Sequence, residues 1–252
     1  MKNAFFLSFF LVLGNLATYG QGTVSDTTLS MSLFQFQGGL NEPFGDMGDL
    51  YGGNASIGFS FAYKTRSNLL LGADFTYIFG NTVRDAGNIM RELRNNQGDI
   101  IGIQGEPINA LIQMRGLTAG FYLGKIWPIF GPNPNSGLVA KLGLVYFEHR
   151  TWIESREDEI PPIEGEYRKG YDRKRAGLAA YQFIGYQHFS DSRFANFFAG
   201  FDFYQGFTTD YRSYNIDEMQ RTNGDYFDLM VGLRVGWVIP VYRQEANKFY
   251  LD

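Results

Sequence analysis

The segment Ala55-Ser56-Ile57-Gly58-Phe59-Ser60-Phe61-Ala62-Tyr63-Lys64 alternates along its whole length, with apolar residues at odd positions and small or polar residues at even positions. Successive side chains of a β-strand point to opposite faces, so this pattern predicts a strand with one apolar face and one face of small residues. The same alternation recurs at 69–79, 117–123, 138–146, 195–203 and 229–239. Together with less regular apolar stretches at about 28–39 and 174–189, these segments predict eight strands.

The predicted strand at 28–39 changes parity part-way along. Leu29, Met31 and Leu33 occupy odd positions, whereas Phe34 and Phe36 occupy even ones. One extra residue in a strand moves the side chains that follow it to the other face, so we predict a β-bulge in this strand.

The connections distinguish a membrane barrel from a soluble β-sandwich, whose strands would alternate in the same way. Outer-membrane barrels have short periplasmic turns and longer outer loops, whereas a sandwich has no reason to sort its loop lengths. Here long connections at 40–51, 81–112, 150–173 and 209–225 alternate with short ones at 65–67, 128–136 and 190–192. The order of connection lengths therefore favours the barrel.

Strand length supports the same interpretation. The predicted strands have about 12 to 17 residues, against a usual length of ~5–6, and can cross a bilayer at a tilt of ~45°. We predict an all-β fold: an eight-stranded antiparallel up-and-down transmembrane β-barrel, with strands from about 28 to 242. Loops 81–112 and 150–173 are expected outside the cell.

The N-terminus predicts a cleaved signal peptide at residues 1–20. Lys2 is followed by the apolar run Ala4-Phe5-Phe6-Leu7-Ser8-Phe9-Phe10-Leu11-Val12-Leu13, which is too short to span a bilayer as a helix. Cleavage after Gly20 would leave a mature chain of residues 21–252, composed of the barrel and a short C-terminal tail. The alternative, a buried core helix, would lack capping residues. The expected location is the bacterial outer membrane.

Composition excludes several classes of function. With 22 Lys+Arg against 26 Asp+Glu, the formal charge is -4, and no extended basic surface is expected for nucleic acid. The chain has no Cys and 2 His, so thiolate sites, Cys nucleophiles and histidine-rich metal sites are excluded. No cofactor and no metal is expected. The aromatic content of 17% fits the girdles of a membrane barrel, and we assign Tyr63, Trp127, Trp237 and Tyr242 to the periplasmic interface.

The small-residue faces also contain charges. Asp74, Lys141, Asp202 and Arg234 have the parity of the inner face. An eight-stranded barrel has room inside only for side chains, and an unpaired buried charge is unfavourable. We therefore predict that these four residues form a polar network in a closed lumen.

With these strands and connections the chain resembles the small eight-stranded outer-membrane β-barrels of the OmpA/OmpX-like superfamily. More specific strings resemble uncharacterised barrels of Gram-negative bacteria that have type IX secretion; they are Gly98-Asp99-Ile100-Ile101-Gly102, Gly131-Pro132-Asn133-Pro134-Asn135-Ser136-Gly137, Lys169-Gly170-Tyr171-Asp172 and Gly236-Trp237-Val238-Ile239-Pro240. A looser similarity is to PorT-like and PorG-like subunits. This resemblance implies an accessory or scaffold role in a secretion or assembly complex of the outer membrane.

An enzymatic alternative rests on His188-Phe189-Ser190 and Asp202. The pattern resembles the His-x-Ser and downstream carboxylate of PagL-like lipid A deacylases, in which His activates Ser toward an ester. Asp191 stands where that family has Asn, Asp202 replaces the usual Glu, and Asp202 has inward parity. We prefer the reading in which His188 and Ser190 lie at a turn and have no catalytic role.

The function predicted from sequence is that of a non-enzymatic integral outer-membrane barrel, either an accessory subunit or a surface-interaction protein. Lipid A deacylation is one alternative, and a small pore is another. The expected partners are outer-membrane lipid and lipopolysaccharide, and proteins that dock on loops 81–112 and 150–173. In the first loop, Ile89, Met90 and Leu93 fit one side of a short helix. The second loop lacks the spacing of a calcium site, so a solvated loop is preferred.

Overall fold

The computed structural model describes residues 27–84, 86–101, 105–108, 110–155, 170–190, 195–212, 214, 216, 219 and 221–242. The predicted signal peptide 1–20 and the tail 243–252 lie outside the described residues. In the part of the chain that the structure describes, no helix has the length and apolarity needed to cross a membrane.

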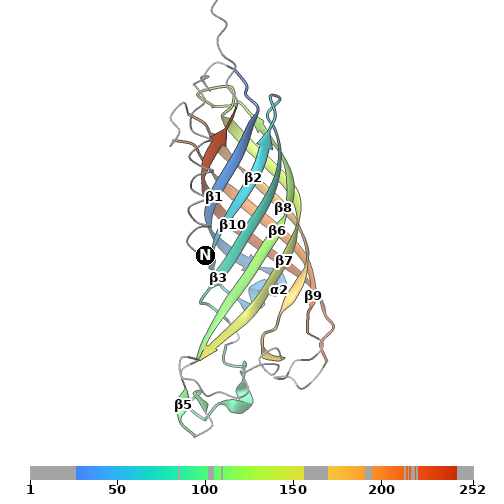
Figure 1. The fold of residues 1–252 in the computed structure, drawn as a ribbon. Helices are drawn as coiled ribbons and strands as arrows, with labels where there is room; N and C mark the ends of the chain where they lie inside the picture. Colours follow the sequence, from blue (N-terminus) through green and yellow to red (C-terminus); the bar gives the residue numbers. More distant parts are fainter. Residues whose placement is uncertain are drawn as a thin grey trace, which may run out of the picture.

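Eight long antiparallel strands close into a barrel (Figure 1). They are β1 (Met31–Phe44), β2 (Asn54–Lys64), β3 (Leu69–Gly80), β6 (Ala110–Trp127), β7 (Gly137–Ser155), β8 (Arg175–His188), β9 (Phe197–Asp210) and β10 (Asp225–Val241). Each strand pairs with its neighbours in the chain, and β1 pairs with β10 to close the ring. The predicted eight-stranded up-and-down barrel is confirmed.

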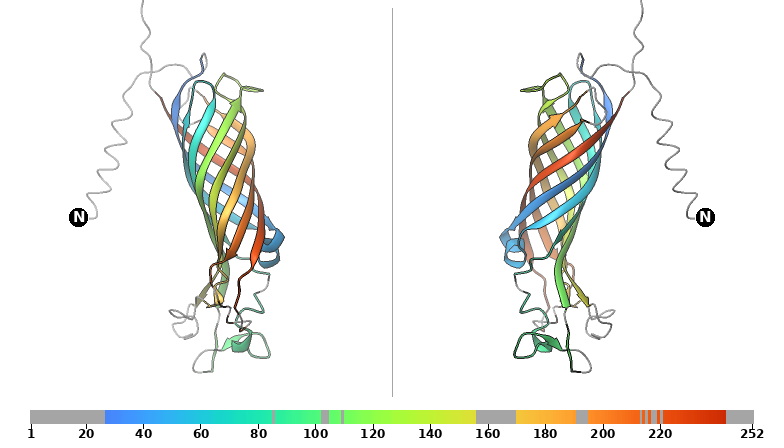
Figure 2. Two further views of the ribbon diagram at one scale, coloured as in Figure 1. Left: turned by 90° about the vertical axis from the view of Figure 1, so that its right-hand side faces the viewer. Right: turned by 90° about the vertical axis from the view of Figure 1, so that its left-hand side faces the viewer.

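The two ends of the barrel differ. Connections 65–68, 128–136 and 189–196 lie at one end, which we call the turn end. Connections 45–53, 81–109, 156–174 and 211–224 lie at the other, the loop end, with the short elements α2 (Gly45–Leu50), η1 (Arg91–Leu93), β4 (Ile100–Ile101) and β5 (Pro107–Ile108). Figure 2 shows α2 at the rim of the barrel and the described part of the connection 81–109 extending beyond it.

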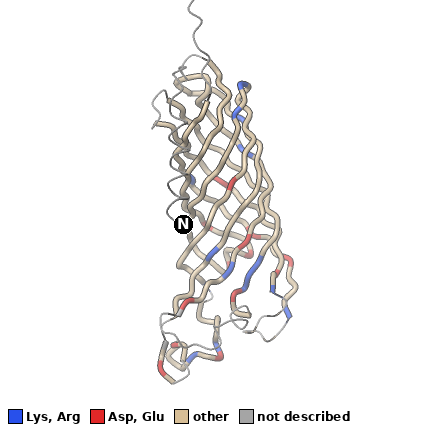
Figure 3. The backbone as a smooth tube through the Cα atoms, in the orientation of Figure 1, with Lys and Arg blue, Asp and Glu red and all other residues tan. Residues whose placement is uncertain are grey.

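The outer wall is apolar. Side chains such as Phe59, Leu71, Phe121, Leu142 and Phe201 are exposed, as the alternation predicts. Charged residues gather mainly at the loop end, and the wall between the ends has few (Figure 3). In the closed ring each strand pairs with two neighbours, so no strand edge is left unpaired, and the apolar wall suits contact with lipid. Antiparallel barrels of this design are typical of bacterial outer membranes. The protein is an integral outer-membrane barrel.

The prediction of a β-bulge in the first strand is wrong. The register of β1 is unbroken against β10, from Ser32↔Val241 to Phe44↔Leu229, and it is equally unbroken against β2. Met31 and Leu33 instead point inward and are almost fully buried. The parity change has a different physical cause: near the turn end the inner face of the barrel is itself filled by apolar side chains.

Candidate functional site

The barrel interior contains a network centred on Arg234 of β10. Its Nε lies 2.6 Å from Oδ2 of Asp202 on β9, and its Nη1 lies 3.3 Å from Oδ2 of Asp74 on β3. Arg234 also donates a hydrogen bond to the Tyr204 hydroxyl. Arg234, Asp74 and Asp202 are all buried. One guanidinium therefore neutralises two carboxylates from different strands, where charges cannot be hydrated by bulk water.

Asp74 has two further donors, one on β1 and one on its own strand. Nε2 of Gln37 donates to Asp74 Oδ2 at 2.6 Å, and the Thr76 hydroxyl donates to Oδ1 at 2.9 Å. The hydrogen bonds satisfy both carboxylate oxygens and connect β1 to β3 across the interior. Because these hydrogen bonds hold the Asp74 carboxylate in place, they also hold the Arg234 guanidinium that pairs with it.

Lys141 lies apart from these ion pairs. Its Nζ donates to Oε1 of Gln35 at 3.3 Å and lies over the rings of Tyr122, Phe183 and Phe198, at 4.9, 5.0 and 4.6 Å from their centroids. No ion pair joins it to a carboxylate among the described residues. Of the four charges assigned to the lumen, the structure brings Asp74, Asp202 and Arg234 into contact and gives Lys141 an aromatic cage.

The turn end is closed by residues of the string Gly131–Gly137. The Lys64 ammonium, fully buried, donates to Asn135 Oδ1 at 2.8 Å and to the Leu29 carbonyl at 3.0 Å. The Asn135 amide donates to the carbonyl of Thr27. The Ser136 hydroxyl accepts from the backbone N–H of Phe189. These bonds fasten the chain before β1 and the turn after β8 to one another across the turn end.

The loop end is closed by a second buried cluster, which sequence reasoning did not assign. His149 Nε2 lies 2.8 Å from Oδ2 of Asp228, which also accepts from the Thr208 hydroxyl. Tyr51 in the connection after α2 is fully buried beside His149, with its hydroxyl 3.0 Å from that of Thr151. Burial raises the pKa of Tyr51 to about 12, so this residue stays neutral. The signal in the sequence was inward parity, which His149, Thr208 and Asp228 share.

The residues of the enzymatic alternative do not come together. The His188 ring stacks on Phe197, 4.9 Å between centroids, and Phe197 is exposed on the lipid side of the wall. Asp202 is inside the barrel, five positions further along β9, or roughly 16 Å at ~3.3 Å per residue. The backbone N–H of Ser190 donates to Asn196. A hydrolytic triad needs its base and carboxylate within hydrogen-bond reach, and the barrel wall separates these two.

The four aromatic residues assigned to the interface differ in their surroundings. Tyr63, Trp127 and Trp237 are exposed on the wall near the turn end, with exposed fractions of 47%, 43% and 41%. Tyr242 is partly buried and packs against the interior apolar cluster. Three residues are therefore placed to contact the interfacial region of the bilayer, whereas the fourth helps to fill the turn end.

The loops beyond the barrel fold around a separate apolar cluster, which we call the head cluster: Ile89, Met90, Ile100, Ile153 and Tyr171. All five side chains are buried. Arg94 fixes the first loop by donating to the backbone carbonyls of Ile89, Gly98 and Ala86. Ile89 and Met90 are buried in the head cluster and precede η1, which is a single 3₁₀ turn. Residues 156–169 of the predicted loop 150–173 lie outside the described residues.

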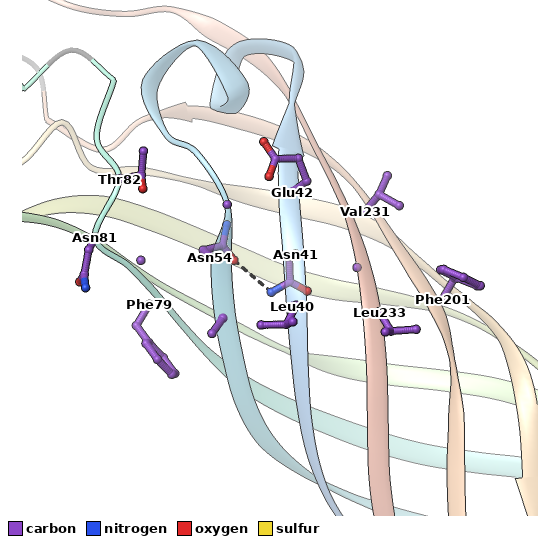
Figure 4. Close-up of a pocket in the computed structure, with 14 residues that line it drawn as sticks. Leu40, Asn41, Glu42, Asn54, Phe79, Asn81, Thr82, Phe201, Val231 and Leu233 are labelled. Atoms are coloured by element: carbon purple, nitrogen blue, oxygen red, sulfur yellow. Dashed lines mark hydrogen bonds between the residues drawn. The ribbon is translucent and has the colours of Figure 1, made fainter.

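A hollow of about 690 Å³ lies on the barrel wall near the loop end (Figure 4). Phe79 and Phe201 stand at its two sides, with Leu40 and Leu233 between them. Glu42, Asn81 and Thr82 line it toward the loop end. On the inner side of the wall, Asn41 donates to Asn54 at 3.0 Å. Among the described residues, no group of His, Asp and Glu side chains is placed to hold a metal ion.

No protein-family model and no curated protein matches this sequence. Several solved structures are similar to this chain at low identity. Neisserial surface protein A (NspA) has 9% identity and a TM-score of 0.42, covering 82% of this chain and 96% of that one. Ail, the attachment invasion locus protein of Yersinia pestis, has 9% identity and a TM-score of 0.41, covering 84% and 99%. The outer membrane protein OprG from Pseudomonas aeruginosa has 10% identity and a TM-score of 0.41, covering 86% and 99%.

Proposed function

We propose that this outer-membrane barrel is a non-enzymatic surface-interaction protein, whose strands anchor a folded head that a protein partner recognises. An accessory subunit of a secretion or assembly complex is one form of this role. The observation that carries the proposal is the head cluster. Ile89, Met90, Ile100 and Tyr171 of the connections pack together against Ile153 at the end of β7, so these connections have an apolar core of their own.

The head combines a fixed backbone with an exposed polar surface. The side chains of Arg91 and Glu92 are 72% and 74% exposed, and Gln97 and Asp99 are exposed in the hairpin turn that Asn95 holds. A surface that is ordered before binding loses less conformational entropy when a partner docks. This favours specific recognition over a merely solubilising role.

The two alternatives gain less support. Deacylation would need His188 and Asp202 on one side of the wall, and a pore would need free space along the axis. Arg234, Lys141 and the buried rings of Tyr122, Tyr181 and Tyr204 occupy the middle of the barrel instead. These buried side chains favour a structural role for the interior over a pore.

Site-specific cross-linking in intact cells tests the proposal. A photoreactive residue at Gln97, exposed in the head, should form an adduct with a defined partner protein. The same residue at Ser67, in the 65–68 turn at the opposite end, should not form that adduct, because we expect the loop end to face outward. Mass spectrometry of the adduct would distinguish a secretion subunit from a surface ligand.

Two outcomes would contradict the proposal. One is the absence of any protein adduct from Gln97 and from Asp99 in cells where the barrel is folded. The other is the same adduct from Ser67 as from Gln97, which would show that the cross-link does not report on the head.

A further inference from the structure

Two glutamine side chains lie on the lipid-facing wall. Gln182 of β8 is in register with Leu142 of β7, which is 63% exposed on that wall, and residues opposite each other in a sheet share a face. Gln205 of β9 is two residues from Phe207, which is 67% exposed, and therefore points outward as well. Ala180, two residues before Gln182, is in register with Gln205, so the two amides are diagonal neighbours.

Apolar rows of the wall border the two amides on both sides. Leu178 and Phe207 lie in the next outward row toward the loop end, and Ile184 and Phe201 lie in the next row toward the turn end. Both amides are therefore within the apolar band that contacts the hydrocarbon of the bilayer, away from the lipid headgroups. Hydrocarbon offers no hydrogen-bond partner, so an amide that faces it is costly, and polar residues at this depth generally have a function.

The hydrogen bond between the amides uses only part of their capacity. Nε2 of Gln182 donates to Oε1 of Gln205 at 3.4 Å, which is longer than the ~3.2 Å limit of most such bonds. In the part of the chain that the structure describes, this is the one hydrogen bond of either side chain. An amide has two N–H donors and a carbonyl with two lone pairs. Each glutamine, only partly buried, therefore keeps at least one donor and one lone pair for a further partner.

We propose that Gln182 and Gln205 form the contact face of a dimer, in which a second copy of this barrel packs against β8 and β9 within the membrane. The occupant is a second copy because the face complements itself. Two copies inserted in the same direction are related by a two-fold axis along the membrane normal, which brings each glutamine level with its own copy. An amide presents both a donor and an acceptor to another amide, whereas acyl chains present neither.

The wall beside the amides allows a close approach. Ala180 has the shortest side chain of its surroundings, and small residues at contacts within membranes let two backbones come near each other. The face is formed by strands alone, so it leaves the head uncovered. This inference therefore does not depend on the function proposed for the head, and the dimer would present two heads side by side.

Cross-linking of the full-length mature protein in lipid vesicles tests this inference. The chain has no Cys, so single cysteines report without interference. Ala180→Cys, beside the amides, should form a dimer adduct with a short bismaleimide. Ala73→Cys is the matched control: Ala73 also faces outward, between Leu71 and Phe75, but on β3 at the other side of the ring, and should stay monomeric.

The amides are tested by adding Gln182→Leu and Gln205→Leu to the Ala180→Cys protein. Half-maximal cross-linking should then need a protein-to-lipid ratio about tenfold higher. Equal adducts from Ala180→Cys and Ala73→Cys, or no shift with the two leucines, would overturn the contact face. An Ala180→Cys adduct in native membranes that contains a different protein and no second copy would overturn the dimer.

A stability measurement separates this role from a merely structural one. If the two amides served only to tie β8 to β9, both leucines together would lower the urea midpoint of the detergent-solubilised monomer. We expect an unchanged midpoint, because leucine suits a wall that faces apolar chains. A lowered midpoint would overturn the proposal. If the leucine variant fails to fold, the comparison of Ala180→Cys with Ala73→Cys still decides whether this face forms the dimer.

Discussion

Arg234→Ala should lower the free energy of unfolding of the detergent-solubilised barrel by roughly 3–5 kcal/mol, because it leaves two buried carboxylates without their cation. Asp202 and Asp74 both contact this guanidinium, and Tyr204 loses its donor. Water entering the space left by the side chain would reduce the effect toward the lower value. Unfolding in urea, followed by the heat-modifiable mobility of the barrel on gels, measures the change.

Two further variants separate charge from volume. Arg91→Ala removes an exposed arginine that pairs with exposed Glu92 in the part of the chain that the structure describes, so its effect should stay below ~1 kcal/mol. Arg234→Met keeps most of the volume and should be nearly as damaging as Arg234→Ala. Combining Arg234→Met with Asp74→Asn and Asp202→Asn should restore most of the stability, because no buried charge of this network is then left unpaired. Arg234→Met with wild-type stability would refute the network as the source of stability.

Gly200→Leu should destabilise the barrel by roughly 3 kcal/mol or prevent its closure, because the inner wall has no space there. Gly200 of β9 pairs with Gly185 of β8. A Cβ on Gly200 would lie 2.3 Å from the Ile184 carbonyl oxygen, 2.5 Å from the Gly185 Cα and 2.7 Å from the Phe183 ring. The first two contacts are with backbone, which cannot move without breaking the ladder.

The effect should extend to Lys141, because displacing Phe183 opens the aromatic cage around its ammonium. Gly87→Leu is the matched control: a Cβ at Gly87 in the head meets nothing within 4 Å. It should change the free energy of unfolding by no more than ~0.5 kcal/mol. A Gly200→Leu barrel as stable as the Gly87→Leu barrel would show that the interior is looser than the structure describes.

The strands and the lipid-facing wall could be predicted from sequence because both depend on local alternation. In 55–64, for example, each outward Phe is two residues from the next, and no distant residue affects that parity. The closure of the ring also followed from loop lengths. Prediction was wrong where apolar residues occupy both faces, as at Met31 and Leu33, because hydrophobicity alone does not tell lipid from a filled lumen.

The remaining features depend on register between strands distant in the chain. The rings around Lys141 come from β6, β8 and β9, so one-residue shifts in pairing would have given this lysine other neighbours. The head cluster joins Ile89 and Ile100 to Ile153 and Tyr171, which short-range patterns cannot connect. In the same way, the hollow is visible only when Ala55 is aligned with Phe79 and Leu40.

Side chains fill this barrel from the turn end to the loop end, with Arg234 buried in the middle and Tyr51 buried at the loop end. Electrical recording across a planar bilayer that contains the purified wild-type protein tests it most directly. We predict no steady single-channel conductance at any applied voltage that the bilayer tolerates. Stable, ion-selective openings from the folded protein would contradict the closed interior and favour the small pore instead.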